Sequence, residues 1–156
     1  MTDIAAVIRR EHARIRRLLG ELDDALAEAG LDGPGPAGRL SQSWAVLAAL
    51  LEAHLDVVEE ICFLPLAAVS PAAGQAISQA ESDGADLRET LREAELHPPG
   101  SREWLLAVRA AADAARSQLS CVDTALAEYA RRAAPRDRDT LHQQWIAYSQ
   151  VRILGD

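Results

Sequence analysis

The sequence predicts an all-α fold, an up-down-up-down antiparallel four-helix bundle with a short fifth helix at its C-terminal end. Alanine and leucine dominate the chain and aromatic residues make up only 4%, a composition typical of helices. Apolar residues recur at alternating spacings of four and three over four long segments, the pattern of a helix face packed inside a bundle. Short segments rich in glycine and proline separate these patterns, and short connections make consecutive helices antiparallel neighbours.

The composition indicates one globular domain over residues 1–156. The chain is 49% hydrophobic and 26% charged, enough apolar material for a real core. Its net charge of -8 argues against nucleic acid or an anionic membrane surface as a partner. We see neither a signal peptide nor an apolar run of transmembrane length, and therefore expect a cytoplasmic protein. Cys62 and Cys121 lie in helical patterns, which favours free thiols in a reducing compartment.

The first two helices carry the most informative stripes. The first is predicted over residues 3–29, followed by Gly30 and a loop of glycine and proline. Pro65 should kink or end the second helix. The stripe of the first helix is Ile4, Ile8, His12, Ile15, Leu19, Leu22 and Leu26, and that of the second is Trp44, Leu47, Leu51, His54, Val58 and Ile61.

The other helices follow from their caps and breaks. Ser70 and Ser101 read as N-caps of a third helix over residues 71–96 and of a fourth that runs to about Ala134, and Pro135 breaks the chain. A last helix over about residues 137–153 presents Leu141, Trp145 and Tyr148 as a cover for the bundle. The stripe of the third helix is Ile77, Ala80, Gly84, Leu87, Leu91 and Ala94, and that of the fourth is Trp104, Val108, Ala111, Ala115, Gln118, Val122 and Ala125.

The chain also contains an internal repeat. Residues 11–19 align with residues 83–91, and residues 53–59 align with residues 117–123, without gaps inside these blocks. Two repeated helical hairpins build a four-helix bundle with a pseudo-symmetric centre. The aligned stripe positions at that centre are His12, His54, Val58, Gly84, Gln118 and Val122.

These residues resemble the hemerythrin-like, or HHE cation-binding, family. Glu11-His12 in the first helix, the motif AHLDVVEEICFLP over residues 53–65, and Gln144-Trp145 in the closing helix carry the resemblance, which covers nearly the whole chain. In that family the six central positions bind a di-iron centre for dioxygen, nitric oxide or peroxide chemistry. The resemblance implies iron ligands at His12 and His54.

The other central positions depart from the family pattern. That pattern would have glutamate at Val58 and Val122 and histidine at Gly84 and Gln118. Glu59 and Glu60 lie roughly 100° and 200° around the helix from Val58, so we expect them on the flank or in solvent. A buried carboxylate without a cation costs several kcal/mol, on the order of 3–5, and replacement by valine suits a metal-free interior.

We therefore expect the centre to hold a ligand-binding cavity, with no cofactor. His12 and His54 would move protons on a small organic molecule near neutral pH, as in an isomerase or a cyclase, and Gln118 would donate a hydrogen bond. A purely structural role, with both histidines hydrogen-bonded inside the core, stays open beside this hypothesis. The expected cavity lining is Ile15, Val58, Gly84, Leu87, Ala115 and Val122.

Two alternatives remain. One is a remodelled metal site for iron or zinc on His12 and His54, completed by Cys121 or Asp83, in an oxygen or nitric oxide sensor or carrier. The other is a non-catalytic interaction module whose exposed stripe, with Trp145 and Tyr148, binds a partner chain. The oligomeric state does not follow from the sequence.

Overall fold

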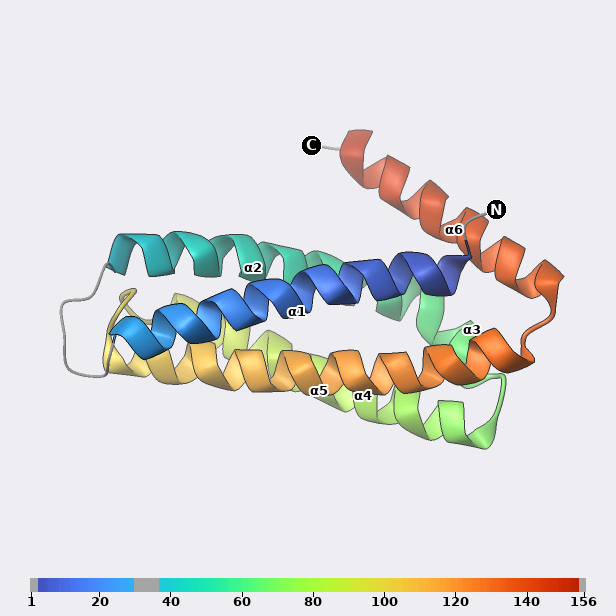
Figure 1. Ribbon diagram of the computed structural model, residues 1–156, viewed down its shortest axis with the longest axis horizontal. Helices are drawn as coiled ribbons and strands as arrows, with labels where there is room; N and C mark the ends of the chain where they lie inside the picture. The colour runs from blue at the N-terminus through green and yellow to red at the C-terminus, as the bar shows by residue number, and fades with distance from the viewer. Residues whose placement is uncertain (1–2, 30–36, 155–156) are drawn as a thin grey trace.

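The computed structural model describes residues 3–29 and 37–154, and these residues fold into helices joined by short turns (Figure 1). The elements are α1 (Ile4–Ala29), α2 (Ala37–Val57), the π-helical turn η1 (Val58–Cys62), α3 (Phe63–Ala67), α4 (Pro71–Glu95), α5 (Arg102–Arg132) and α6 (Pro135–Leu154). No strand occurs among the described residues, so the predicted all-α class is confirmed. The loop expected after Gly30 lies outside them.

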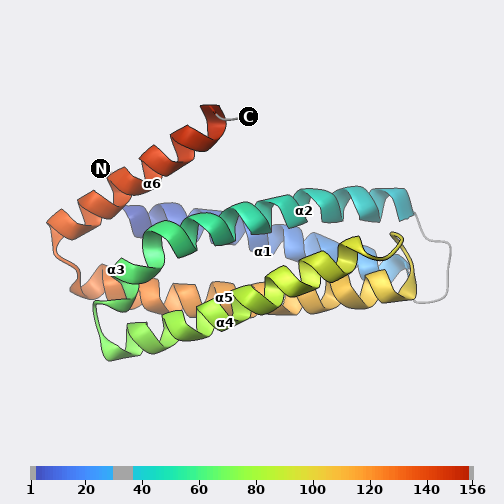
Figure 2. The same cartoon turned by 180° about the vertical axis from the view of Figure 1, so that it is seen from behind.

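The four long segments form the predicted antiparallel bundle. In Figures 1 and 2, α1 and α2 lie side by side on one side of the molecule, and α4 and α5 lie on the other. Successive helices run in opposite directions, and α4 and α5 make the most extensive contacts of any pair. Contacts of α1 with α5 and of α2 with α4 close the bundle.

The starts of α4 and α5 follow from their caps. The Ser70 hydroxyl accepts a hydrogen bond from the Ala73 N–H at 3.1 Å, and the Ser101 hydroxyl accepts one from the Trp104 N–H at 3.2 Å. Each cap satisfies an N–H that the first turn of a helix leaves without a partner. Gly100, directly before the second cap, has a φ of 87°, in the left-handed region that glycine adopts without strain. Both predicted N-caps are confirmed.

The end of the second bundle segment differs from the prediction. At η1 the Phe63 N–H bonds to the Val58 carbonyl five residues back, so this turn contains one extra residue. Pro65, which has no N–H to offer the helix, follows in the first turn of α3. Because of the extra residue, Cys62 is fully buried, whereas Ile61 is only half-buried. The prediction of Ile61 on the buried stripe is therefore wrong.

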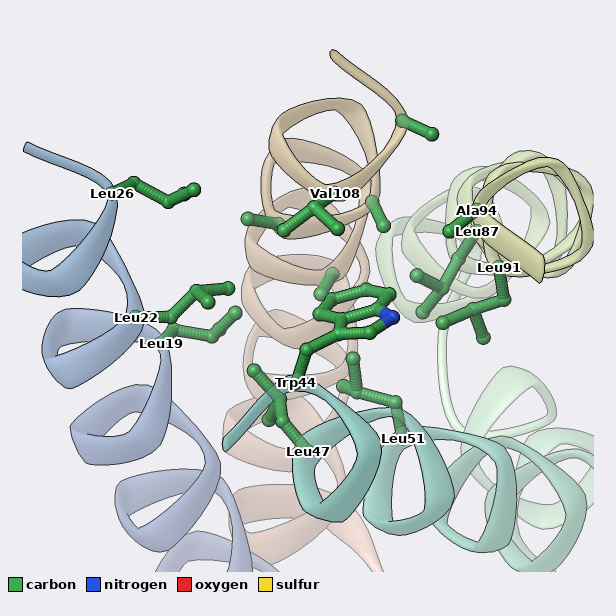
Figure 3. Close-up of a cluster of buried hydrophobic side chains, with 14 of the residues drawn as sticks. Leu19, Leu22, Leu26, Trp44, Leu47, Leu51, Leu87, Leu91, Ala94 and Val108 are labelled. Atoms are coloured by element: carbon green, nitrogen blue, oxygen red, sulfur yellow. The ribbon is translucent and has the colours of Figure 1, made fainter. Parts of the chain in front are cut away.

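The apolar core has two parts. One cluster lies at the end of the bundle around Trp44, whose ring meets the Trp104 ring edge-on at 6.4 Å. Figure 3 shows Trp44 among leucines of α1, α2 and α4. The second cluster lies at the other end and includes Val58, Cys62, Val122 and residues of α6. A polar side chain at the middle of the bundle therefore lies between two apolar clusters.

Helix α6 closes the second end of the bundle. It begins at Pro135, the helix position where a missing N–H costs least. It contacts α1 and η1, and its C-terminal half leaves the bundle (Figure 1). Leu141 is 2% exposed and Trp145 is 7% exposed, as expected of a cover. Trp145 therefore does not lie on an exposed stripe, and binding of a partner chain by this helix stays a prediction. Among the described residues, no helix combines the length and apolarity needed to cross a membrane.

Candidate functional site: a buried polar layer

A layer of polar side chains lies between the two apolar clusters. His12 comes from α1, His54 from α2 and Gln118 from α5, and they are 0%, 1% and 1% exposed. The two imidazole rings meet edge to face, with their centroids 4.9 Å apart and an angle of 74° between their planes. The structure therefore brings the two predicted histidines into direct contact. Their function in catalysis or binding remains a prediction.

Each histidine is held by a carboxylate from the adjacent helix. The His12 Nδ1 lies 2.6 Å from Asp123 Oδ1, and the His54 Nδ1 lies 2.9 Å from Glu11 Oε1. The other carboxylate oxygen of Asp123, Oδ2, forms an ion pair with Arg16 at 2.7 Å. An ionised carboxylate only accepts hydrogen bonds, so each ring carries its proton on Nδ1 when it is neutral. Each Nε2 is then an acceptor.

These two carboxylates were not predicted, although their positions beside the buried stripes could have indicated them. Glu11 directly precedes a stripe position and Asp123 directly follows one. A residue beside the stripe lies about 100° around the helix, where it faces the neighbouring helix rather than the centre. Acidic residues at such positions are placed to reach a buried histidine of the next helix.

Burial and charge act in opposite directions on this network. Burial lowers the pKa of His12 below its usual 6.5, nearby His54 lowers it further, and the hydrogen bond to Asp123 only partly offsets these effects. Burial alone would raise the pKa of Asp123, but the bonds to His12 and Arg16 outweigh it and hold that pKa below its usual value. At neutral pH the pair is thus a neutral imidazole donating to an ionised carboxylate.

Three nitrogen atoms of the layer have no hydrogen-bond partner among the described residues. They are the Nε2 atoms of His12, His54 and Gln118. Buried polar atoms are nearly always paired, and an unpaired one costs about 1–3 kcal/mol. Two buried acceptors and one buried amide donor in one layer are therefore an arrangement that a bound molecule would stabilise.

The residues expected to line a cavity are buried in the bundle. Ile15, Val58, Ala115 and Val122 are 0% exposed and Leu87 is 1% exposed. At buried Gly84, an added Cβ would lie 3.0 Å from Glu59 Oε1 and 3.4 Å from a methyl group of Leu55. The prediction that Gly84 opens an emptied pocket is therefore wrong, because Glu59 and Leu55 occupy that space.

Glu59 lies on the flank of its helix, as expected, and Glu60 is exposed. Both Glu59 carboxylate oxygens accept hydrogen bonds from Arg88, at 2.6 and 2.7 Å. Arg88 also donates a hydrogen bond to Asp56. In the internal repeat, Glu59 aligns with Asp123 and Arg88 aligns with Arg16. The two ion pairs, Asp123 with Arg16 and Glu59 with Arg88, are thus equivalent in the two halves of the bundle.

Asp83 and Cys121 meet each other rather than the histidines. Asp83, 8% exposed, accepts hydrogen bonds from Ser117 at 2.7 Å, from Gln79 at 3.0 Å and from the Cys121 thiol at 3.6 Å. Burial and this carboxylate raise the pKa of the Cys121 thiol. Within residues 3–29 and 37–154, no three His, Cys, Asp or Glu side chains gather as a metal-ligand group. The expectation that Cys121 or Asp83 completes a metal site with His12 and His54 is wrong.

Pockets open on the surface of the bundle between the described helices, and those at the following places are not lined by a histidine of the polar layer. They lie between α3, α5 and α6, beside Trp44 and Trp104, beside Arg88, and between α1 and α5. The polar layer is therefore closed off from these openings.

Comparison with known proteins gives one match. The family model described as Hemerythrin HHE cation binding domain matches residues 3–141. No curated protein and no solved structure matches the chain.

We predict that His12 makes the stability of the fold depend on pH. Because its pKa is lowered in the folded state, the unfolded chain binds the proton first as the pH falls, so the free energy of unfolding decreases below about 6.5. Urea unfolding of the wild type and of His12→Gln from pH 8 to pH 5 measures this. The stability difference between the two proteins should shrink as the pH falls; a constant difference would contradict the buried neutral ring.

We also predict opposite outcomes for alanine at two glycines. Nothing lies within 4 Å of a Cβ added at Gly20, so Gly20→Ala should raise the free energy of unfolding by about 0.5–1 kcal/mol. Gly84→Ala should lack this gain, because its methyl group displaces Glu59 from Arg88. Thermal unfolding of both variants compares them. An equal gain at the two sites would show that the space beside Gly84 is open.

Proposed function

Because the chain belongs to the hemerythrin HHE cation-binding domain family, we propose that it keeps the bundle of that family and uses the polar layer to bind a small organic molecule. His12 and His54 provide two acceptors and Gln118 provides one amide. One observation carries this proposal: their three buried nitrogen atoms lack partners among the described residues. The site is metal-independent in this proposal.

The side chains of the layer do not fit a di-iron centre. Such a centre needs bridging carboxylates and several imidazoles. The layer has two imidazoles, while Val58 and Val122 are apolar and fully buried, and Glu59 is bound to Arg88 beside Gly84. The nearest carboxylates, Glu11 and Asp123, bind the Nδ1 atoms of the histidines. The proposed chemistry therefore uses the side chains of the chain alone.

The hydrogen-bond pattern defines the ligand. Two neutral imidazoles accept at Nε2 and the Gln118 amide donates, so a complementary molecule has two N–H or O–H donors and one acceptor. The side chains of the layer are 0–1% exposed, so the ligand in this proposal is a molecule of a few heavy atoms.

The same geometry gives the site acid–base capacity. A ring whose Nδ1 is held by a carboxylate is fixed in orientation and takes up a proton at Nε2 with its positive charge stabilised. Asp123 and Glu11 hold His12 and His54 in this way. One ring can take a proton from a bound molecule at its Nε2 and return the same proton to another atom of that molecule, so that the ring ends neutral again. This supports proton transfer, such as an isomerisation, as the reaction class if the protein is an enzyme.

A second function has its own supporting observation. Histidines that bind metals usually donate their other ring N–H to a carboxylate, and both histidines of the layer do so. A single iron or zinc ion held by His12 and His54, as in a sensor or carrier, is therefore the alternative. We place either function in the cytoplasm, where the free thiols of Cys62 and Cys121 would stay reduced.

Metal content separates the two functions. Protein purified without chelator and without added metal should contain well under one iron or zinc per chain by elemental analysis, since the layer lacks anionic donors for a cation. One ion per chain in the wild type, lost in His12→Ala/His54→Ala, would replace our proposal with the metal-binding function.

Formamide is the matched probe for the organic ligand. Its two N–H groups suit the two imidazoles and its oxygen suits the Gln118 amide, while N,N-dimethylformamide lacks both donors. NMR titration should show saturable shifts of amide signals around the layer with formamide only. Gln118→Leu should weaken binding roughly tenfold, about the effect of one lost hydrogen bond, and His12→Ala/His54→Ala should abolish it.

The surface variant His97→Ala is the control and should bind formamide as the wild type does. Unfolding curves of all variants establish that they are folded. If folded His12→Ala/His54→Ala binds formamide like the wild type, or if the two probes bind equally, the polar layer is not the binding site.

A further inference from the structure

A second candidate site lies at the end of the bundle, in the groove between α3, the end of α5 and α6. Its volume is about 760 Å³, within the range of roughly 300–1,000 Å³ typical of small-molecule sites. The groove is separate from the polar layer, since neither histidine nor Gln118 lines it. Nothing in the proposed function uses this groove.

The walls of the groove are mainly apolar. Ile61, Leu64 and Val69 line it from η1, α3 and the following turn, and Leu141 lines it from α6. Leu64 is 84% exposed, which is unusual for a leucine beside a groove. A ligand that covers this side chain would gain hydrophobic free energy at about 25 cal/mol for each Å² removed from water.

One buried hydroxyl lies in the wall of the same groove. Tyr129 is 2% exposed and lines the groove, and its hydroxyl oxygen has no hydrogen-bond partner among the described residues. Buried tyrosine hydroxyls usually find a partner. This unpaired group is the second, independent indication that a molecule completes the site.

The charges at the rim select the kind of molecule. Glu60 and Asp137 line the groove, and neither carboxylate has a hydrogen-bond or ion-pair partner within the described segments. Arg132, the one basic residue of the lining, is bound to Glu128 at 2.9 Å. The lining thus has two carboxylates and one guanidinium, which shares Glu128 with Arg131, in a protein whose net charge is -8.

We propose that this groove binds an organic cation with an apolar body, such as a hydrophobic amine. The apolar part covers Leu64 and Ile61, and the cationic group lies between Glu60 and Asp137. Acidic clefts attract cations and repel anions of the same shape. The volume suits one molecule of this size rather than a protein segment.

Three eight-carbon probes test the proposal on the full chain by isothermal titration calorimetry, below their micelle concentrations. They are octylammonium, 1-octanol and octanesulfonate, which share the eight-carbon chain and differ in charge. We expect one octylammonium to bind per protein chain, 1-octanol to bind more weakly, and octanesulfonate to bind at least tenfold more weakly than the cation. Raising the salt concentration should weaken binding of the cation alone, because salt screens its attraction to the exposed carboxylates. Equal affinity for the cation and the anion would overturn the proposal.

Matched variants locate the site. Ala68→Trp places a large ring in the groove from an exposed position, and it should abolish binding of the cation. Ala110→Trp adds the same ring at an exposed position of α5 outside the groove and should leave binding unchanged. If Ala68→Trp binds the cation as well as Ala110→Trp does, the groove is not the site.

A second pair of variants tests the charges. Glu60→Gln/Asp137→Asn should weaken binding of the cation roughly fivefold, the range expected for two exposed carboxylates. The affinity for 1-octanol should stay unchanged. Glu89→Gln/Asp86→Asn removes two exposed charges of α4 outside the groove and should change neither affinity. An equal loss in both double variants would show that net charge, and not this rim, attracts the cation.

Discussion

The pairing of two buried histidines with two carboxylates is the interaction on which the centre of this bundle depends. A buried ring N–H without a partner would cost about 1–3 kcal/mol. Here Asp123 and Glu11 accept from the Nδ1 atoms of His12 and His54. The pairs satisfy one side of each ring and fix its orientation. They leave the two Nε2 atoms facing the interior, and every functional proposal for the layer follows from those two atoms.

The internal repeat explains how such a layer arises. The two halves of the bundle place carboxylates at equivalent positions, Glu11 with Asp83 and Glu59 with Asp123. Glu11 binds His54, whereas its counterpart Asp83 binds Ser117 and Cys121. Glu59 binds Arg88, whereas its counterpart Asp123 binds Arg16 and also His12. The polar scaffold is thus repeated, while the inward side chains are not. Such an asymmetric centre suits an asymmetric ligand better than a symmetric pair of ions.

Much of the fold followed from the sequence, because helix stripes and caps are local signals. The stripe through Ile4, Ile8 and His12 and the cap at Ser101 needed no knowledge of the partner helices. The extra residue at η1 could not be predicted, since one π-turn changes no composition and only exchanges Ile61 for Cys62 on the buried face. The filling of the space at Gly84 was also missed, because it depends on the Glu59 side chain, which Arg88 holds from another helix.

The sequence predicted the inward-facing residues of the candidate site but not the carboxylates that hold them. His12, His54 and Gln118 stand on the stripes, whereas Glu11 and Asp123 stand beside them and act across helix interfaces. A prediction from stripes alone therefore finds which side chains point inward. It does not find the hydrogen bonds that decide which nitrogen atom carries the proton, and that choice depends on the packing of the helices around the centre.

The most direct measurement is the protonation of the two histidine rings, read from long-range proton–nitrogen NMR spectra of the protein at neutral pH without added metal. The proposed arrangement predicts that both rings are neutral, with the proton on Nδ1 and a free lone pair on Nε2, and that a chelator leaves the spectra unchanged. Rings protonated on Nε2, or signals that change when a chelator is added, would contradict it.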